Sequence, residues 1–204
     1  LGFLERALAA ESRARPYTVL DQADRQLCEV LLARSQCRYH LGQWPKAVQD
    51  ARAALALAEE VRSPRLLSRV NAELGNQMRV MGHLDEAEEH LRGALRHAEA
   101  CGDTSLRPIP LYQLGGLLWT KGELDQAEGL WIEALSTAQR VGDERAMGFG
   151  YNGLGILAIC KGQSMEARKH LEGSAKLFER LGMLAPLAIA RVNLAEVYHY
   201  TGIL

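Results

Sequence analysis

The segment “GFGYNG” at residues 148–153 matches the spacing G-x-G-x-x-G, which lets a backbone approach the phosphates of a dinucleotide. That chemistry requires a β-strand before the first glycine. Residues 124–141 precede it instead, and their apolar positions recur with the period of a helix. The alternative is a helix in which small residues allow a second helix to pack closely. We therefore predict helix packing, and no bound cofactor, for these glycines.

Three histidines have a constant spacing that could suggest a metal site. His83, His90 and His97 follow one another at intervals of seven residues in one predicted helix. Two helical turns rise about 10 Å, which is too far for neighbouring histidines to share one ion. His90 also shares a repeat phase with His170, which places it on the predicted solvent face. We expect no metal site and a solvated His90.

Acidic residues gather directly after two predicted turns, in “DEAEE” at 85–89 and “DQAE” at 125–128. Paired carboxylates can carry out acid–base chemistry. Acidic residues in the first turn of a helix more simply complement the helix dipole. No Ser/His/Asp or Cys/His grouping stands out in the sequence. We predict no catalytic residues and a protein that is not an enzyme.

The cysteines indicate the redox compartment, and the overall charge indicates which partners are excluded. Cys28, Cys37, Cys101 and Cys160 form no CxxC pair, and three of them fall in helical patterns, where a free cysteine usually behaves as a small buried residue. This favours a reducing, cytoplasmic location.

The formal net charge of -1 provides no basic field for nucleic acid or an anionic membrane, and no apolar run is long enough to span a bilayer.

A period of 40 residues organises the chain. Glycines recur at residues 2, 42, 82, 122, 162 and 202, and an alanine follows each of the first five by five residues. A second series, at residues 102, 142 and 182, is interrupted once by Arg62. Such periods indicate stacked supersecondary units that bury their apolar faces against one another. A positive φ at Gly82 would let the chain reverse, and the small Gly75 and Ala87 would let the two joined helices approach.

These residues resemble the tetratricopeptide repeat, whose pattern is W-x2-L-G-x2-Y followed by Ala and an aromatic residue. In the third repeat the matching positions are Leu111, Leu114-Gly115, Leu118, Ala127 and Trp131. The first repeat departs most, with Arg34-Ser35 in place of Leu-Gly. The long period is similar to that of arrays in kinesin light chains, LGN-type adaptors, bacterial signal-transduction ATPases and maltose-activator-like regulators. The resemblance implies an all-α fold, a right-handed α-solenoid of stacked antiparallel helix pairs.

We predict a single array over residues 1–204. Its predicted parts are the second helix of a partial repeat at 1–21, four repeats at about 22–63, 64–103, 104–143 and 144–183, and the first helix of a further repeat at 184–204. Because neither end has a polar capping element, we expect the sequence to be a segment of a longer chain.

The resemblance also implies where a partner would bind, because the first helices of tetratricopeptide arrays line a concave groove. It assigns 30 positions to that groove, and these hold five of the twelve aromatic residues. Aromatic rings supply contact area and amides can bond a peptide main chain. The alternative is that these rings pack between repeats. The predicted partner-binding residues are Tyr39, Arg69, Asn76, Arg79, Tyr112, Gln113, Trp119, Phe149, Asn152, Asn193, Glu196 and Tyr200.

The predicted function is a protein–protein interaction scaffold that binds a peptide segment in this groove. The predicted partner is a protein or peptide, with no direct contact to nucleic acid or membrane. The alternative is the sensor or regulatory arm of a larger signal-transduction ATPase or transcriptional regulator, which would bind an effector or other domains of its own chain. A nucleotide-binding domain upstream, or a helix-turn-helix downstream, would favour the alternative.

Overall fold

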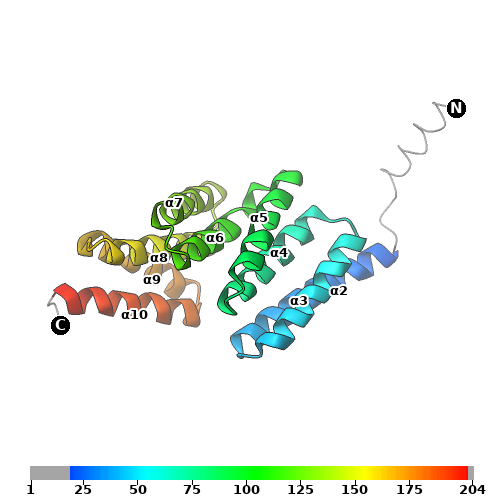
Figure 1. The fold of residues 1–204 in the computed structure, drawn as a ribbon, viewed down its shortest axis with the longest axis horizontal. Helices are drawn as coiled ribbons and strands as arrows, with labels where there is room; N and C mark the ends of the chain where they lie inside the picture. Colours follow the sequence, from blue (N-terminus) through cyan, green and yellow to red (C-terminus); the bar gives the residue numbers. More distant parts are fainter. Residues whose placement is uncertain (1–18, 202–204) are drawn as a thin grey trace.

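The computed structural model describes residues 19–201, and in this range the chain forms α-helices, one short 3₁₀ helix and no β-strand (Figure 1). The helices are α2 (Val19–His40), α3 (Trp44–Glu60), α4 (Pro64–Val80), α5 (Leu84–Ala100), η1 (Thr104–Leu106), α6 (Pro108–Thr120), α7 (Leu124–Val141), α8 (Glu144–Cys160), α9 (Ser164–Arg180) and α10 (Leu184–Thr201). No helix in this range combines the length and the hydropathy that a membrane span requires. The predicted all-α fold is confirmed.

Consecutive helices pack in pairs along the array (Figure 1). α2 packs on α3, α4 on α5, α6 on α7 and α8 on α9, and α10 lies on α9. The even-numbered helices also contact one another in succession, from α2 to α10. They therefore share one side of a helical solenoid, as predicted for stacked helix pairs. Most of the partial repeat predicted at 1–21, and the glycines at 2 and 202, lie outside the described residues.

The turns between helices repeat one backbone geometry. Gly82, between α4 and α5, has a φ of 83°, in the left-handed region that glycine adopts without steric cost. The backbone N–H of Gly82 donates to the Arg79 carbonyl of α4 at 3.1 Å, and that of His83 donates to the Met78 carbonyl at 2.9 Å. The same two bonds close the turns at Gly122 and Gly162. Arg62 takes the glycine position after α3 and keeps the left-handed geometry, with a φ of 47°.

Small residues bring the helices into close contact. A Cβ atom at Gly75 would lie 2.5 Å from a leucine side chain of α5. On α8, a Cβ atom at Gly148 would lie 2.8 Å from the Phe178 ring, and one at Gly153 would lie 2.7 Å from the Trp131 ring. Two of the three glycines of “GFGYNG” thus make room for neighbouring rings from within a helix, and a Cβ atom at the third, Gly150, would lie 3.0 Å from the Leu135 side chain. The packing interpretation of this segment is confirmed.

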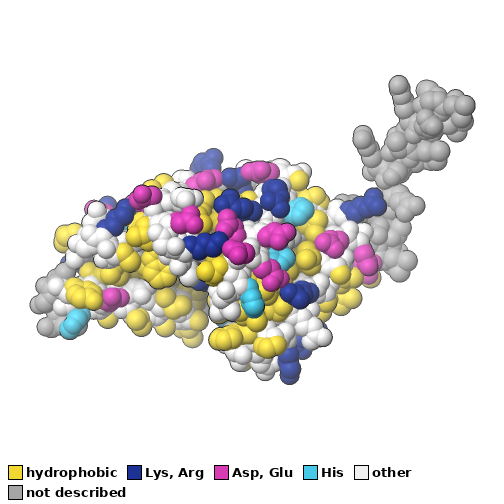
Figure 2. Space-filling model, in the orientation of Figure 1, with side chains coloured by type: hydrophobic (Ala, Val, Ile, Leu, Met, Phe, Trp, Pro, Cys, Tyr) yellow, Lys and Arg dark blue, Asp and Glu magenta, His cyan; other side chains and the backbone are white. Residues whose placement is uncertain are grey.

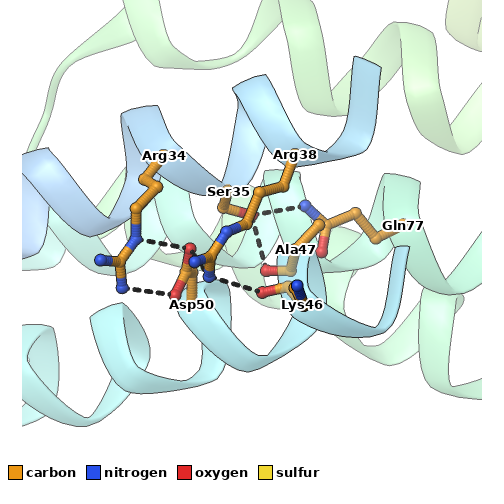
Figure 3. Close-up of polar contacts among 7 residues, drawn as sticks. All are labelled: Arg34, Ser35, Arg38, Lys46, Ala47, Asp50 and Gln77. Carbon is orange, nitrogen blue, oxygen red and sulfur yellow. Dashed lines mark hydrogen bonds and ion pairs between the residues drawn. The ribbon is translucent and has the colours of Figure 1, made fainter. Parts of the chain in front are cut away.

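The first helix pair is joined by polar side chains where later pairs use Leu-Gly (Figure 3). Ser35, at the glycine position of α2, is fully buried. Its hydroxyl donates to the Ala47 carbonyl of α3 at 2.8 Å and accepts from Nε2 of Gln77 on α4 at 2.7 Å. One hydroxyl therefore links three helices, and satisfied hydrogen bonds replace the close apolar approach.

Asp50 of α3 completes this polar junction (Figure 3). It is 3% exposed, accepts two hydrogen bonds from Arg34, at 2.8 and 2.7 Å, and accepts another from Arg38. The hydrogen bond from Arg34 is the main cause that lowers the pKa of the Asp50 carboxyl, against a desolvation that raises it. The departure of the first repeat from the Leu-Gly pattern is thus accompanied by its own ion-pair network.

Two predictions about exposure are wrong. His90 was expected in solvent, but only 19% of its side chain is exposed, and its Nδ1 is hydrogen-bonded to Oδ1 of Asn71 on α4 at 2.9 Å. Burial lowers the pKa of this imidazole. Of the cysteines only Cys28 is buried, and the other three are exposed. A helical pattern alone therefore does not tell which side of the helix a small residue occupies.

Candidate partner-binding surface

The even-numbered helices carry the residues predicted to bind a partner. We call the side chains that they contribute the first-helix surface, which comprises the twelve predicted residues together with Gln36, His40, Glu73 and Arg145. Alternate helices contact each other directly, so these side chains come from adjacent parallel elements of one wall.

Tyr112 of α6 lies at the centre of this surface. Its ring centre is 5.2 Å from that of Phe149 on α8. Burial raises the pKa of the Tyr112 hydroxyl, while Arg79 of α4 and a hydrogen bond from Asn152 of α8 oppose the increase and Tyr39 of α2 adds to it. These influences come from α2, α4 and α8. Tyr112 therefore joins α6 to α8 through its ring, and its hydroxyl is influenced by charged and polar groups of α2 and α4.

Amide side chains on α6, α8 and α10 belong to the same surface. Asn193 Nδ2 of α10 donates to Oδ1 of Asn152 at 3.2 Å, and Asn152 is 5% exposed. Gln113 of α6 has a buried Oε1 with no hydrogen-bond partner among the described residues. A buried acceptor without a partner costs about 1–3 kcal/mol. A donor supplied by a bound molecule would remove that cost.

The two predicted arginines of α4 differ in their partners. Arg69 forms an ion pair with Glu29 of α2. Arg79 forms no ion pair within residues 19–201. Its Nη2 donates to Oδ1 of Asn76 at 3.1 Å, and its Nε is buried without a partner. Arg79 is therefore the predicted cation that remains available to a ligand.

Sequence reasoning missed a polar cluster around Glu73 of α4. Gln36 Nε2 and Gln77 Nε2 donate to its carboxylate at 3.1 and 2.7 Å. Burial raises the pKa of Glu73 and outweighs the two glutamines, His40 and Arg145, which all act to lower it. Gln36 and His40 are among the 30 groove positions that the resemblance assigns, although neither is among the twelve predicted binding residues. Gln77 occupies a core position and Arg145 lies one turn outside the pattern, so only the structure reveals them.

Four of the five predicted aromatic residues divide into two groups, and the fifth, Tyr39, lies with its ring centre 5.4 Å from that of its neighbour His40. Phe149 packs on Phe178 of α9, with ring centres 5.0 Å apart, and on Tyr112, as the packing alternative anticipates. Trp119 at the end of α6 is 39% exposed, and Tyr200 of α10 is 72% exposed. Glu196 is exposed as well. The rings at the centre of the surface are therefore held in place by packing, and the exposed ones lie at helix ends.

A second candidate is an open cleft of about 600 Å³ between α3, α4 and α5. Its rim carries Glu59, Glu86 and Glu89, and it contains His90 and His97. Figure 2 shows histidine side chains among acidic ones over α5. The described residues contain no group of ligands that could hold a metal ion. The cleft has no phenylalanine, tyrosine or tryptophan and none of the unpartnered buried atoms, so the first-helix surface is the stronger candidate.

Comparisons with known proteins establish the type of repeat. No protein-family model and no curated protein matches the sequence. The structure of BtubC (BKLC) from P. vanneervenii superposes on this chain with 25% sequence identity and a TM-score of 0.68. The superposition covers 98% of this chain and 84% of the BtubC chain. A Signal Transduction ATPase with Numerous Domains from Pyrococcus horikoshii, which has a tetratricopeptide repeat sensor, matches 97% of this chain with 18% identity and a TM-score of 0.64. The chain therefore has a tetratricopeptide-type repeat fold, like that of these solved structures.

A third solved structure shares the tetratricopeptide-type fold. It is a Rap protein complexed with Competence and Sporulation Factor, which matches 95% of this chain with 15% identity and a TM-score of 0.71. The present array spans 52% of that Rap chain and 30% of the ATPase chain. These similarities confirm the family resemblance seen in the sequence, and at such identities they show the fold.

Proposed function

We propose that this chain is a non-catalytic interaction module whose first-helix surface binds a peptide segment of a protein partner. The observation that supports the proposal is the Tyr112–Phe149 ring pair on adjacent first helices, with the Asn152–Asn193 amide pair on α8 and α10. Arg79 of α4, which forms no ion pair within the described residues, adds a cation to the same surface. Aromatic residues and arginine dominate the energetics of protein interfaces. A Rap protein of the same fold forms a complex with Competence and Sporulation Factor, which is consistent with a binding role.

Two glycines provide the test, one on an even-numbered helix and one on an odd-numbered helix. Gly116 of α6 lies one turn after Tyr112, and Gly129 is exposed on α7. A Cβ atom at either position would meet nothing within 4 Å. Gly116→Leu therefore fills space where we place the partner, whereas Gly129→Leu fills space over an odd-numbered helix. Leucine forms helix better than glycine does, so neither change should lower stability.

Random peptides displayed on phage and selected on the wild-type chain supply the ligands. We expect Gly116→Leu to weaken their binding by about tenfold or more in calorimetric titrations, as loss of a central contact does. Gly129→Leu should leave the affinity unchanged. If both variants melt normally and bind equally well, the partner does not occupy the first-helix surface.

The second candidate function is a sensor arm that binds an effector or other domains of its own chain. The observation in its favour is the match to the ATPase with a tetratricopeptide repeat sensor. The full-length gene discriminates between the two functions. A nucleotide-binding or helix-turn-helix domain encoded beside this array would favour the sensor arm.

A further inference from the structure

Exposed apolar side chains gather at the turns that join first helices to second helices. Of the fifteen large apolar side chains that are exposed within residues 19–201, six lie at or beside the first three of these turns. We call this group the turn edge, and it comprises Leu41, Trp44, Val80, Met81, Trp119 and Leu124. The turns of the opposite edge, after α3, α5 and α7, contribute none of the fifteen. Apolar surface gathered in this way marks an interaction site.

Charged side chains tie the three turns into one continuous edge. Arg52 of α3 contacts Glu86 of α5 at 2.9 Å. Lys121, in the turn between α6 and α7, contacts Asp85 and Glu88 of α5 at 3.3 and 2.7 Å. The first helices α2, α4 and α6 also contact one another in succession. Each turn therefore adjoins the next along the array.

The spacing of the turns matches the repeat of an amphipathic helix. Helices in contact have axes about 8–10 Å apart, so successive turns are separated by about the same distance. Seven residues of an α-helix rise about 10.5 Å, at 1.5 Å per residue. A helix of about 15 residues laid along the turn edge would therefore place one apolar side chain against each of the three turns.

The charge of the turn edge selects the chemistry of that helix. The three turns contain two lysines and four acidic residues, a formal charge of -2, over residues 41–46, 81–86 and 121–126. Two of the acidic residues, Glu123 and Asp125, form no ion pair within residues 19–201. This charge would repel an anionic membrane or the same edge of a second copy. It would attract lysine or arginine beside the apolar stripe of a helix.

We propose that the turn edge is a second binding surface, which takes an amphipathic helix of a partner protein. The helix carries an apolar residue at every seventh position, against the turns, and lysine or arginine beside that stripe. Trp44 and Trp119 supply the large ring areas that anchor such interfaces. Only Trp119 belongs to the first-helix surface as well, so the inference does not rest on the proposed function.

The test selects helices from a phage library in which leucine is fixed at the first and fourth positions of each heptad and all other positions are random. The wild-type chain is the target. Affinities of synthetic copies of the selected helices are measured on the wild type and on Leu41→Ser, Met81→Ser, Leu124→Ser and the triple variant. Ile132→Ser, which removes a side chain that is 53% exposed on α7, is the matched control.

We expect the selected helices to be enriched in lysine and arginine at the random positions. Each single substitution on the turn edge should weaken their binding about fivefold, and the triple variant should weaken it about a hundredfold, because apolar burial is lost at each turn. Ile132→Ser should leave the affinity unchanged. The Leu41 side chain is 72% exposed, so Leu41→Ser keeps the fold intact even where Leu124→Ser lowers the melting temperature.

The charge is tested separately. Glu123→Gln combined with Asp125→Asn should weaken the basic helices about threefold or more at low ionic strength, and the loss should shrink in high salt. Glu89→Gln, which neutralises an exposed acidic residue of α5, is the control and should have no effect.

Other outcomes would overturn the inference. Selected helices that bind the triple variant within about twofold of the wild type would occupy another surface. Vesicles of phosphatidylcholine and phosphatidylserine that bind the wild type but not the triple variant would assign the turn edge to a membrane. A wild-type dimer in sedimentation velocity that the triple variant does not form would assign it to a second copy. A selection that enriches no helix would also contradict the proposal.

Discussion

Glu73 shows how burial and hydrogen bonding oppose each other at a single residue. Burial raises the pKa of its carboxyl above the ordinary 4.5, in spite of bonds from Gln77 and Gln36. The folded chain therefore holds a proton on Glu73 more tightly than the unfolded chain does. The stabilisation that follows is fully present below the ordinary pKa and is lost as the pH rises through the raised value.

We accordingly expect Glu73→Gln to raise the melting temperature relative to the wild type at pH 7. Glutamine keeps an acceptor oxygen but cannot ionise, so it avoids the cost of burying a charge. The advantage should shrink as the pH falls through the ordinary pKa of 4.5, because the unfolded chain then takes up the proton as well. Calorimetric melts of the two proteins across this range provide the measurement. A constant difference at all pH values would assign the effect to packing.

The two tryptophans nearest Tyr112 in the sequence should differ in how much they stabilise the fold. Trp131 is 2% exposed, and its Nε1 donates to the Tyr112 carbonyl at 3.0 Å, whereas Trp119 is 39% exposed. We expect Trp131→Ala to lower the free energy of unfolding by about 3–5 kcal/mol. Trp119→Ala should cost about 0.5 kcal/mol, as surface changes do. Urea denaturation measures both, and comparable losses would place Trp119 in the core.

At the scale of helices, much of the packing could be predicted because the repeat holds equivalent contacts at equivalent positions. The turn at Gly82 and the close approach at Gly75 follow from residue size and backbone geometry alone. The placement of Arg145 and Gln77 could not be predicted in this way, because it depends on how far long side chains reach across two helices. His90 was misplaced for a related reason: its phase was known, but its hydrogen bond to Asn71 of another helix was not.

Two glycines in first helices should respond in opposite ways to the same substitution. A Cβ atom at Gly153 would lie 2.7 Å from the Trp131 ring, whereas one at Gly116 would meet nothing within 4 Å. Gly153→Ala should therefore destabilise the protein by about 1–3 kcal/mol through overpacking. Gly116→Ala should stabilise it by about 0.5–1 kcal/mol, because alanine has the higher helix propensity. Chemical denaturation distinguishes the two, and a loss at both positions would mean that α6 is covered at Gly116.

At the scale of the whole molecule, each helix contacts only its neighbours in the array. α10 packs on α9 and α8 alone among the described helices. Its outward apolar side chains Leu184, Ile189 and Val192 are 77%, 56% and 68% exposed. Stability in such arrays is a sum over neighbouring interfaces, so elements with fewer interfaces open more readily.

Hydrogen exchange should reveal this gradient. We expect backbone amides of α10 to exchange about tenfold faster, or more, than those of α6 and α8, which have neighbours on both sides. Mass spectrometry of peptic fragments under native conditions gives the rates. Equal protection from α4 to α10 would show instead that the array opens as one cooperative unit.

The shared geometry of the turns at Gly82, Gly122 and Gly162 has a consequence for the gene. Because the backbone enters and leaves each helix pair in the same way, a block of one period can be inserted or lost between equivalent turns without redirecting the chain. Recombination between neighbouring copies produces such a change in a single event. Evolution can therefore adjust the length of the first-helix surface in whole helix pairs, and with it the length of partner that fits, while the chemistry of each remaining pair is inherited unchanged.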